Sequence, residues 1–196
     1  MRFRTLALTV ATLIAAFASE ANAQDCPTKA SGKRFLVERE GAAKTEIFHV
    51  DNDITRTVWR SGGRVVLETS QFQGLFQLDR IEEGRRTELL PQAALAKLFP
   101  LKTGQNVTTR FDIKESNGQN RMLTVVLSVK DSGSLFIGPC KYNILKIDRS
   151  ESRSADAPRF VNTDYYSPDL KLIIAKEYKK DGKTNLIKFD RISANP

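Results

Sequence analysis

The chain has 196 residues, with 31 lysines and arginines against 23 aspartates and glutamates, and a net charge of +8 at pH 7. A chain of this length buries enough surface to fold around one core. It contains 2 cysteines and 1 histidine, too few for the compact set of ligands that a structural zinc site needs, so we expect no metal site.

The N-terminal segment has the layout of a secretory signal peptide. A basic start at Arg2 and Arg4 precedes an apolar run from Leu6 to Phe17, and an Ala-Asn-Ala cleavage site ends at Ala23. The apolar run is shorter than the roughly 20 residues that span a bilayer. We therefore predict a periplasmic protein without a transmembrane anchor after cleavage, in which residues 1–23 are the signal peptide and residues 24–196 form a single β domain.

Export affects how the two cysteines and the basic charge are interpreted. In an oxidising compartment an even number of cysteines indicates disulfides, so we predict a bond between Cys26 and Cys140. A basic charge usually suggests nucleic acid, but in an exported protein it either suits anionic molecules of the cell envelope or merely keeps the protein soluble. The expected partner is an anionic lipid, a glycan or another envelope protein, and no nucleic acid.

From Lys33 onward, apolar and polar residues alternate in short runs separated by turn residues, the pattern of half-buried antiparallel strands. Gly41-Ala42-Ala43 and Ser61-Gly62-Gly63 indicate hairpin turns. The strands predicted in the N-terminal half are 34–40, 45–50, 54–60, 64–69 and 72–81.

One segment favours a helix. Pro91 suits a first helical turn, and Ala94, Leu95 and Leu98 belong to a one-sided apolar face. Pro100 ends the segment because it keeps the preceding residue extended. We predict a short helix over 91–98, preceded by a solvated loop over 82–86.

The alternation then resumes. Asn117-Gly118 between two alternating runs is the strongest hairpin signal in the chain. Further turns are indicated by Ser167-Pro168-Asp169 and Asp181-Gly182-Lys183, and a polar loop by residues 150–157. The strands predicted here are 106–114, 121–130, 135–137 and 141–149, followed by those of the C-terminal hairpin segment 159–192.

Consecutive hairpins without intervening helices exclude a parallel α/β fold. A meander of this many strands must curl, so we predict an all-β protein whose antiparallel meander forms a curved half-barrel or a barrel-like sheet with one short helix.

Three short motifs carry a resemblance to a known group of proteins. They are Phe99-Pro100-Leu101-Lys102-Thr103-Gly104-Gln105, Gly138-Pro139-Cys140, and Tyr165-Tyr166-Ser167-Pro168-Asp169-Leu170 followed by Lys176-Glu177. In this order they resemble uncharacterised periplasmic β-rich proteins of proteobacteria, in which a PL-x-x-G entry precedes a long hairpin and a Tyr-Ser-Pro turn precedes the last strand pair. The resemblance implies a curved sheet with an apolar concave face, and it carries over no activity and no catalytic residue.

No motif for catalysis or for a cofactor stands out. The chain lacks a phosphate-binding loop, a dinucleotide fingerprint and an EF-hand loop. His49 lies between Phe48 and Val50 in a predicted strand, a placement that favours a structural role. We expect no cofactor and favour a non-catalytic protein that binds or scaffolds an envelope component. A cofactor-free hydrolase of cell-wall or envelope glycans, using two carboxylates, is the alternative.

Two sets of residues are candidates for a ligand site. Aromatic residues recur along the predicted strands and either fill the core or leave a concave face for an apolar ligand. Lysines near the C-terminal hairpin either meet an anionic headgroup at the rim of that face or keep a strand edge from pairing. The candidate apolar face is Trp59, Phe111, Phe136, Tyr142, Tyr165 and Tyr178, and the candidate rim is Lys171, Lys176, Lys179, Lys180 and Lys183.

Overall fold

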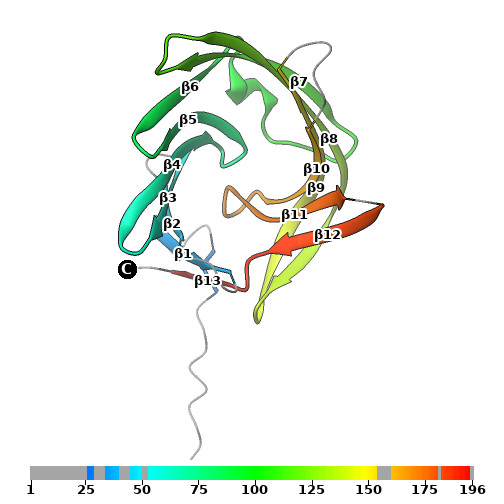
Figure 1. Ribbon diagram of the computed structural model, residues 1–196. Helices are drawn as coiled ribbons and strands as arrows, with labels where there is room; N and C mark the ends of the chain where they lie inside the picture. Colours follow the sequence, from blue (N-terminus) through cyan, green and yellow to red (C-terminus); the bar gives the residue numbers. More distant parts are fainter. Residues whose placement is uncertain are drawn as a thin grey trace, which may run out of the picture.

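A computed structural model describes residues 26–28, 34–39, 45–49, 53–153, 160–180 and 182–194. These residues form one 13-stranded sheet of antiparallel strands that curls around its own interior (Figure 1). The predicted all-β antiparallel meander is confirmed. The predicted signal peptide, the turn at 41–43 and the end of the polar loop at 154–157 lie outside the described residues.

The order of strands in the sheet follows the chain from β1 to β12, and β13 adds to the far side of β1. The first six strands are β1 (Arg34–Glu38), β2 (Thr45–His49), β3 (Ile54–Ser61), β4 (Arg64–Phe72), β5 (Phe76–Glu82) and β6 (Arg85–Pro91). A 3-10 helix, η1 (Leu95–Leu98), leads to β7 (Asn106–Glu115), β8 (Asn120–Ile137), β9 (Cys140–Ser152), β10 (Phe160–Ser167), β11 (Leu172–Lys180), β12 (Lys183–Lys188) and β13 (Arg191–Ala194). Within the described ranges, no helix is long and apolar enough to cross a membrane.

The end of the chain brings the two edges of the sheet together. Strand β12 pairs with β11 at one edge and β13 pairs with β1 at the other, although only Phe189 and Asp190 separate β12 from β13. The amide of Phe189 donates to the Ile174 carbonyl on β11 (3.3 Å), and the amide of Asp190 donates to the Glu38 carbonyl on β1 (2.9 Å). We call this junction the seam. At the seam the chain stops pairing with β11 and starts pairing with β1, and β12 and β13 do not pair with each other (Figure 1).

Two clusters of buried side chains fill the interior, and β11 lies between them. Leu172 and Ile174 on β11 belong to one cluster, whereas Ile173 packs against the other. This alternation fits the path of β11 across the middle of the curled sheet (Figure 1). The cluster on the β5–β8 side includes Phe76, Phe111, Val125 and Leu127, and the cluster on the β1–β2 side includes Phe35, Ile47, Ile144 and Ile192.

The turn between β10 and β11 enters the interior and is held there by polar contacts from the opposite wall. Thr55 Oγ1 donates to the Lys171 carbonyl (3.2 Å), and His49 Nε2 lies 3.0 Å from the Leu170 carbonyl oxygen, to which it donates. Gly74 in the β4–β5 turn lies so close to Lys171 that a Cβ atom there would overlap the carbonyl oxygen of Lys171. This turn therefore fills part of the interior that the sequence analysis considered as space for an apolar ligand.

Several boundaries differ from those predicted from the sequence. The predicted strand 72–81 is interrupted by a turn at 73–75, and the predicted loop 82–86 contains only a short turn between β5 and β6. Pro91 ends β6 opposite Phe111, so the predicted helix over 91–98 shortens to η1. Strand pairing with β7, which buries Leu89, outweighs the weak local preference for a helix.

The hairpin of β8 and β9 is longer than predicted. Strand β8 continues through Asp131 to Gly133, between the predicted strands 121–130 and 135–137, and β9 continues to Ser152. A register shift between Val129 and Asp131 takes up an extra residue, so the ladder persists past the polar segment. The predicted disulfide between Cys26 and Cys140 ties the N-terminal residues of the described chain to the start of β9.

Candidate functional site

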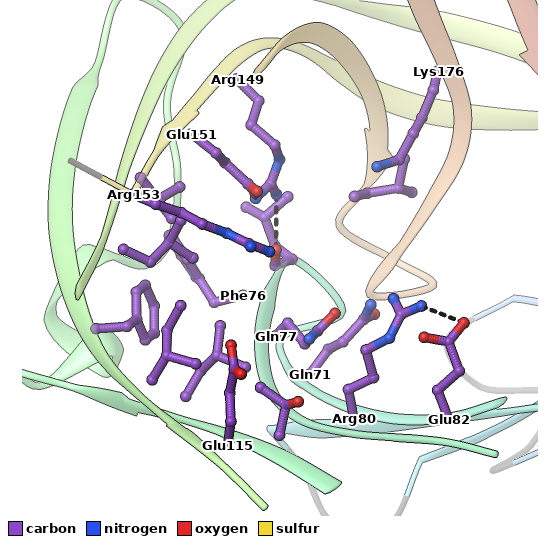
Figure 2. A pocket seen from close by; sticks show the side chains of 18 residues that line it. Gln71, Phe76, Gln77, Arg80, Glu82, Glu115, Arg149, Glu151, Arg153 and Lys176 are labelled. Atoms are coloured by element: carbon purple, nitrogen blue, oxygen red, sulfur yellow. Dashed lines mark hydrogen bonds and ion pairs between the residues drawn. The ribbon is translucent and has the colours of Figure 1, made fainter. Parts of the chain in front are cut away.

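The inner face of the sheet lines a partly open cavity of about 520 Å³ beside β11 (Figure 2). Its volume falls in the range of about 300–1,000 Å³ typical of small-molecule sites. Every strand from β4 to β9 contributes to the lining. The lining residues are Gln71, Leu75, Phe76, Gln77, Arg80, Glu82, Thr87, Leu89, Phe111, Ile113, Glu115, Leu123, Val125, Arg149, Glu151, Arg153, Ile173 and Lys176.

One wall of the cavity is apolar because strand alternation turns every second residue of β7 and β8 inward. Phe111 and Ile113 on β7 and Leu123 and Val125 on β8 are buried, whereas their neighbours along each strand are more exposed. The ring of Phe76 packs against that of Phe111, with centroids 6.2 Å apart. This contact joins the start of β5 to the apolar wall.

The opposite wall is polar. Gln71 on β4 and Gln77 and Arg80 on β5 lie together there, next to Glu82 (Figure 2). Arg80 Nη2 lies 2.8 Å from Glu82 Oε1. Each glutamine amide offers both donors and acceptors to a ligand. The cavity is therefore amphipathic, with an apolar wall facing a wall of hydrogen-bonding groups.

Arg149 on β9 reaches the cavity from a buried ion-pair network. Its Nε donates to Asp164 Oδ2 (2.5 Å), Nη1 donates to Glu151 Oε1 (3.0 Å), and Nη2 donates to the Leu75 carbonyl (2.8 Å). Burial acts to lower the pKa of Arg149, but Asp164 and Glu151 more than offset it and raise the pKa above its ordinary value. The guanidinium therefore stays charged and links β9 to β10 and to the β4–β5 turn.

Lys176 on β11 extends this network into the cavity. Its Nζ lies 3.5 Å from Oδ1 of Asp164, which is fully buried. The same oxygen accepts a hydrogen bond from Asn162 Nδ2. Asp164 is thus shared between a guanidinium, an ammonium and an amide, and Lys176 is held at the cavity wall.

The carboxylates of the cavity are all engaged with arginines. Glu82 and Glu151 have the partners described above, and Glu115 lies 3.8 Å from Arg121. The pairs of Glu82 and Glu115 are largely exposed, and that of Glu151 belongs to the buried network of Arg149, so ion pairing accounts for all three carboxylates. In the part of the chain that the structure describes, no three histidine, cysteine, aspartate or glutamate side chains gather as a metal site would require. The groups present supply an apolar surface, hydrogen bonds and charge, which are means of binding a ligand.

Comparison with known proteins gives a distant structural similarity. No family model matches the chain, and no curated protein matches it. The crystal structure of the hypothetical lipoprotein YmcC from Escherichia coli K12 resembles this chain with a TM-score of 0.48 and 11% sequence identity, over 81% of each chain. A similarity of this strength assigns neither ligand nor activity here.

The candidate rim lysines are dispersed, and Lys176 is the one that lines the cavity. Lys171 is half-buried in the β10–β11 turn and lies 3.8 Å from Asp53. Lys179 and Lys183 are exposed near the β11–β12 turn, and the side chain of Lys180 lies outside the described residues.

The candidate aromatic face is likewise divided among several surfaces. Phe111 lines the cavity, whereas Tyr142 is buried in the cluster on the β1–β2 side, where burial raises its pKa to about 12. Trp59 is 40% and Phe136 is 55% exposed. The half-buried Tyr165 donates from its hydroxyl to Glu177 Oε2 (2.9 Å), and the half-buried Tyr178 lines a smaller cavity. The six residues therefore do not form one surface.

His49 makes structural contacts inside the curled sheet, in line with the structural role that its sequence context favoured. Besides its bond to Leu170, its ring packs edge-on against Phe35, with centroids 5.2 Å apart. Burial lowers its pKa below the ordinary value of 6.5, and nearby Lys171 acts in the same direction, against the hydrogen bond to Leu170. His49 contributes to holding the inserted turn and does not line the cavity.

Sequence reasoning missed the charged residues Arg80, Arg149 and Asp164. A signal for Arg149 was present, because it follows Ile147 by two positions and therefore shares its inward phase. Asp164 shares the phase of Asn162 in the same way. A charged residue whose position in the strand alternation places it on the buried face indicates a buried ion pair. Two such residues of opposite charge on adjacent strands indicate that they are each other's partners.

Proposed function

We propose that this chain is a non-catalytic binding protein whose interior cavity holds an amphiphilic component of the cell envelope. The supporting observation is the division of the cavity into the apolar wall around Phe111 and Val125 and the polar wall around Gln71 and Gln77. A wholly polar ligand would leave the apolar wall unmatched. A wholly apolar ligand would remove water from the amides without replacing their hydrogen bonds. An amphiphile satisfies both walls.

Export to the periplasm belongs to the same proposal. Its support is the signal-peptide layout of residues 1–23 and the bond between Cys26 and Cys140, since disulfides persist in oxidising compartments. On this proposal, residues 24–196 form a single β domain that works in the periplasm.

Native mass spectrometry of the protein recovered from the periplasm tests both parts. We expect the mass of a chain that begins at Gln24. We also expect additional peaks from non-covalently bound amphiphile, which collisional activation should release. A protein that stays in the cytosol, or one that binds neither the uncharged probe monomyristoylglycerol nor an anionic amphiphile with the same acyl chain, would contradict the proposal.

A pair of variants locates the binding. Thr87 lines the cavity from β6, whereas Thr108 is exposed on the neighbouring strand β7. Thr87→Trp should weaken binding of monomyristoylglycerol by about tenfold or more, because the indole ring occupies space that the ligand needs. Thr108→Trp adds the same side chain elsewhere and should leave the affinity unchanged. Equal affinities of the two variants would exclude the cavity as the site.

A further inference from the structure

A second, smaller cavity of about 210 Å³ adjoins the first one at the seam. Ile173 and Lys176 line both cavities, so the two cavities share part of their lining on β11. The smaller one, which we call the seam cavity, is completed by residues from three places in the chain. These are Arg39 after β1, Tyr178 on β11, and Ile187, Lys188 and Phe189 at the end of β12.

The charged side chains that line the seam cavity are all cations. They are Arg39, Lys176 and Lys188, and no carboxylate of the described residues joins them in the lining. Within the same ranges, neither Arg39 nor Lys188 forms an ion pair. The larger cavity differs, because its glutamates have arginine partners. Lys176 is paired with Asp164 (3.5 Å), so the charge of the seam cavity that no ion pair within these ranges neutralises is that of Arg39 and Lys188.

The cations of the seam cavity lie beside apolar side chains. Ile174, Ile187 and Phe189 form an apolar lining beside them. Arg39 and Lys188 are exposed and Ile187 is 43% exposed, so the seam cavity is open to solvent, and its attraction for an anion comes from several cations that line one space. The cations also come from segments far apart in the sequence, namely the residue after β1, β11 and the end of β12, and the seam holds them around one space.

We propose that the seam cavity binds an anionic group, a phosphate or a carboxylate, of the same amphiphile whose body occupies the larger cavity. This inference rests on the proposed function, because it assigns the charge of that ligand. Lys176 lies at the junction and contacts the anion, while Ile173 packs against the adjacent part of the ligand.

Probes that share one acyl chain and differ in charge test the inference. The neutral probe is monomyristoylglycerol, and the anionic probes are myristate, which carries a carboxylate, and myristoyl lysophosphatidic acid, which carries a phosphate. We expect the full-length mature protein to bind at least one anionic probe about tenfold or more tightly than the neutral one at low salt, and we expect this preference to shrink as salt screens the charges. The better anionic probe identifies the source of the charge.

Matched double variants assign the preference to the seam cavity. Arg39→Gln with Lys188→Gln should abolish the preference for anionic probes and leave the affinity for monomyristoylglycerol unchanged. Arg64→Gln with Lys114→Gln removes the same charge from exposed positions outside both cavities and should keep the preference. Unchanged thermal unfolding of both variants verifies that they are folded.

The failures of the two proposals are distinguishable. If the protein binds the neutral and anionic probes equally well, the inference about the seam cavity is wrong and the proposed function stands. If both double variants lose the preference alike, a general charge effect explains it and the inference is again wrong. If no probe binds, the proposed function itself is overturned.

Discussion

Arg149 sits among three acceptors in the interior of the sheet, with 7% of its side chain exposed, and Asp164 beside it has none exposed. Removing two such charges from water is costly, and their attraction offsets the cost only when the geometry is good and the remaining hydrogen bonds are made. Both conditions hold here, since the guanidinium also donates to Glu151 and to the Leu75 carbonyl. The pair therefore positions β9 against β10 and the β4–β5 turn, and so shapes the back of the cavity.

We predict that Arg149→Met destabilises the protein by about 3–5 kcal/mol, because Asp164 would stay buried without its main partner. Urea denaturation followed by circular dichroism measures the change. Arg56→Met is the control, because it removes an exposed pair with Glu68 and should cost less than about 1 kcal/mol. Equal losses for the two variants would show that the buried network does not hold the sheet together.

At the scale of elements, the contact between two turns sets the shape of the interior. The β10–β11 turn enters the curled sheet and meets the β4–β5 turn at Gly74. Tyr166 on β10 supports the contact, since its hydroxyl donates to the Gln73 carbonyl (2.8 Å). With this turn inserted, β11 separates the two clusters of buried side chains, and the space that remains on one side of it is the larger cavity.

Gly74→Ala tests this contact. Both Gly74 (φ 65°) and Gly118 (φ 81°) have positive φ, for which alanine costs about 1–2 kcal/mol. A Cβ at Gly74 would also overlap the Lys171 carbonyl oxygen, whereas Gly118 has open space. We therefore expect Gly74→Ala to lose clearly more stability than Gly118→Ala in thermal and urea unfolding. Similar losses would mean that the two turns do not need to touch.

At the scale of the whole molecule, two long-range connections join the ends of the chain to the sheet. The seam carries the C-terminal residues from β11 across to β1 through Phe189 and Asp190. The disulfide joins Cys26 to Cys140 across a sequence separation of 114 residues. Both connections restrict how far the curled sheet can open, and the seam cavity depends on the first of them.

The double variant Cys26→Ser with Cys140→Ser should lower the free energy of unfolding by about 4–5 kcal/mol, because the long loop becomes unrestricted in the unfolded chain. Urea denaturation under oxidising conditions measures this difference. Wild-type protein treated with a reductant is the control and should match the double variant. A much smaller loss would indicate that the folded sheet restrains the N-terminal segment without the bond.

Local patterns predicted local structure well. The turn at Asn117-Gly118 joins β7 to β8, as the sequence indicated, because this dipeptide adopts the backbone angles that a hairpin needs. The patterns failed where pairing between strands overrode local preference, as at Asp131 to Gly133, which continues β8. They also failed to bring the right residues into one site, because a register shift changes which side chains face inward. Arg149 and Lys176 became site residues only when β9 and β11 were placed across one cavity.

By itself, the sequence determined that this chain forms antiparallel β-sheet and that its two cysteines are a pair, because alternation, turn chemistry and cysteine count are properties of short segments or of composition. Only the tertiary structure decided that the β10–β11 turn fills part of the interior, that Arg149 and Asp164 meet there, and that Arg39 and Lys188 line one cavity at the seam. These outcomes depend on how far the sheet curls and on where its edges meet. Both are set by packing between residues far apart in the chain, which no local pattern records.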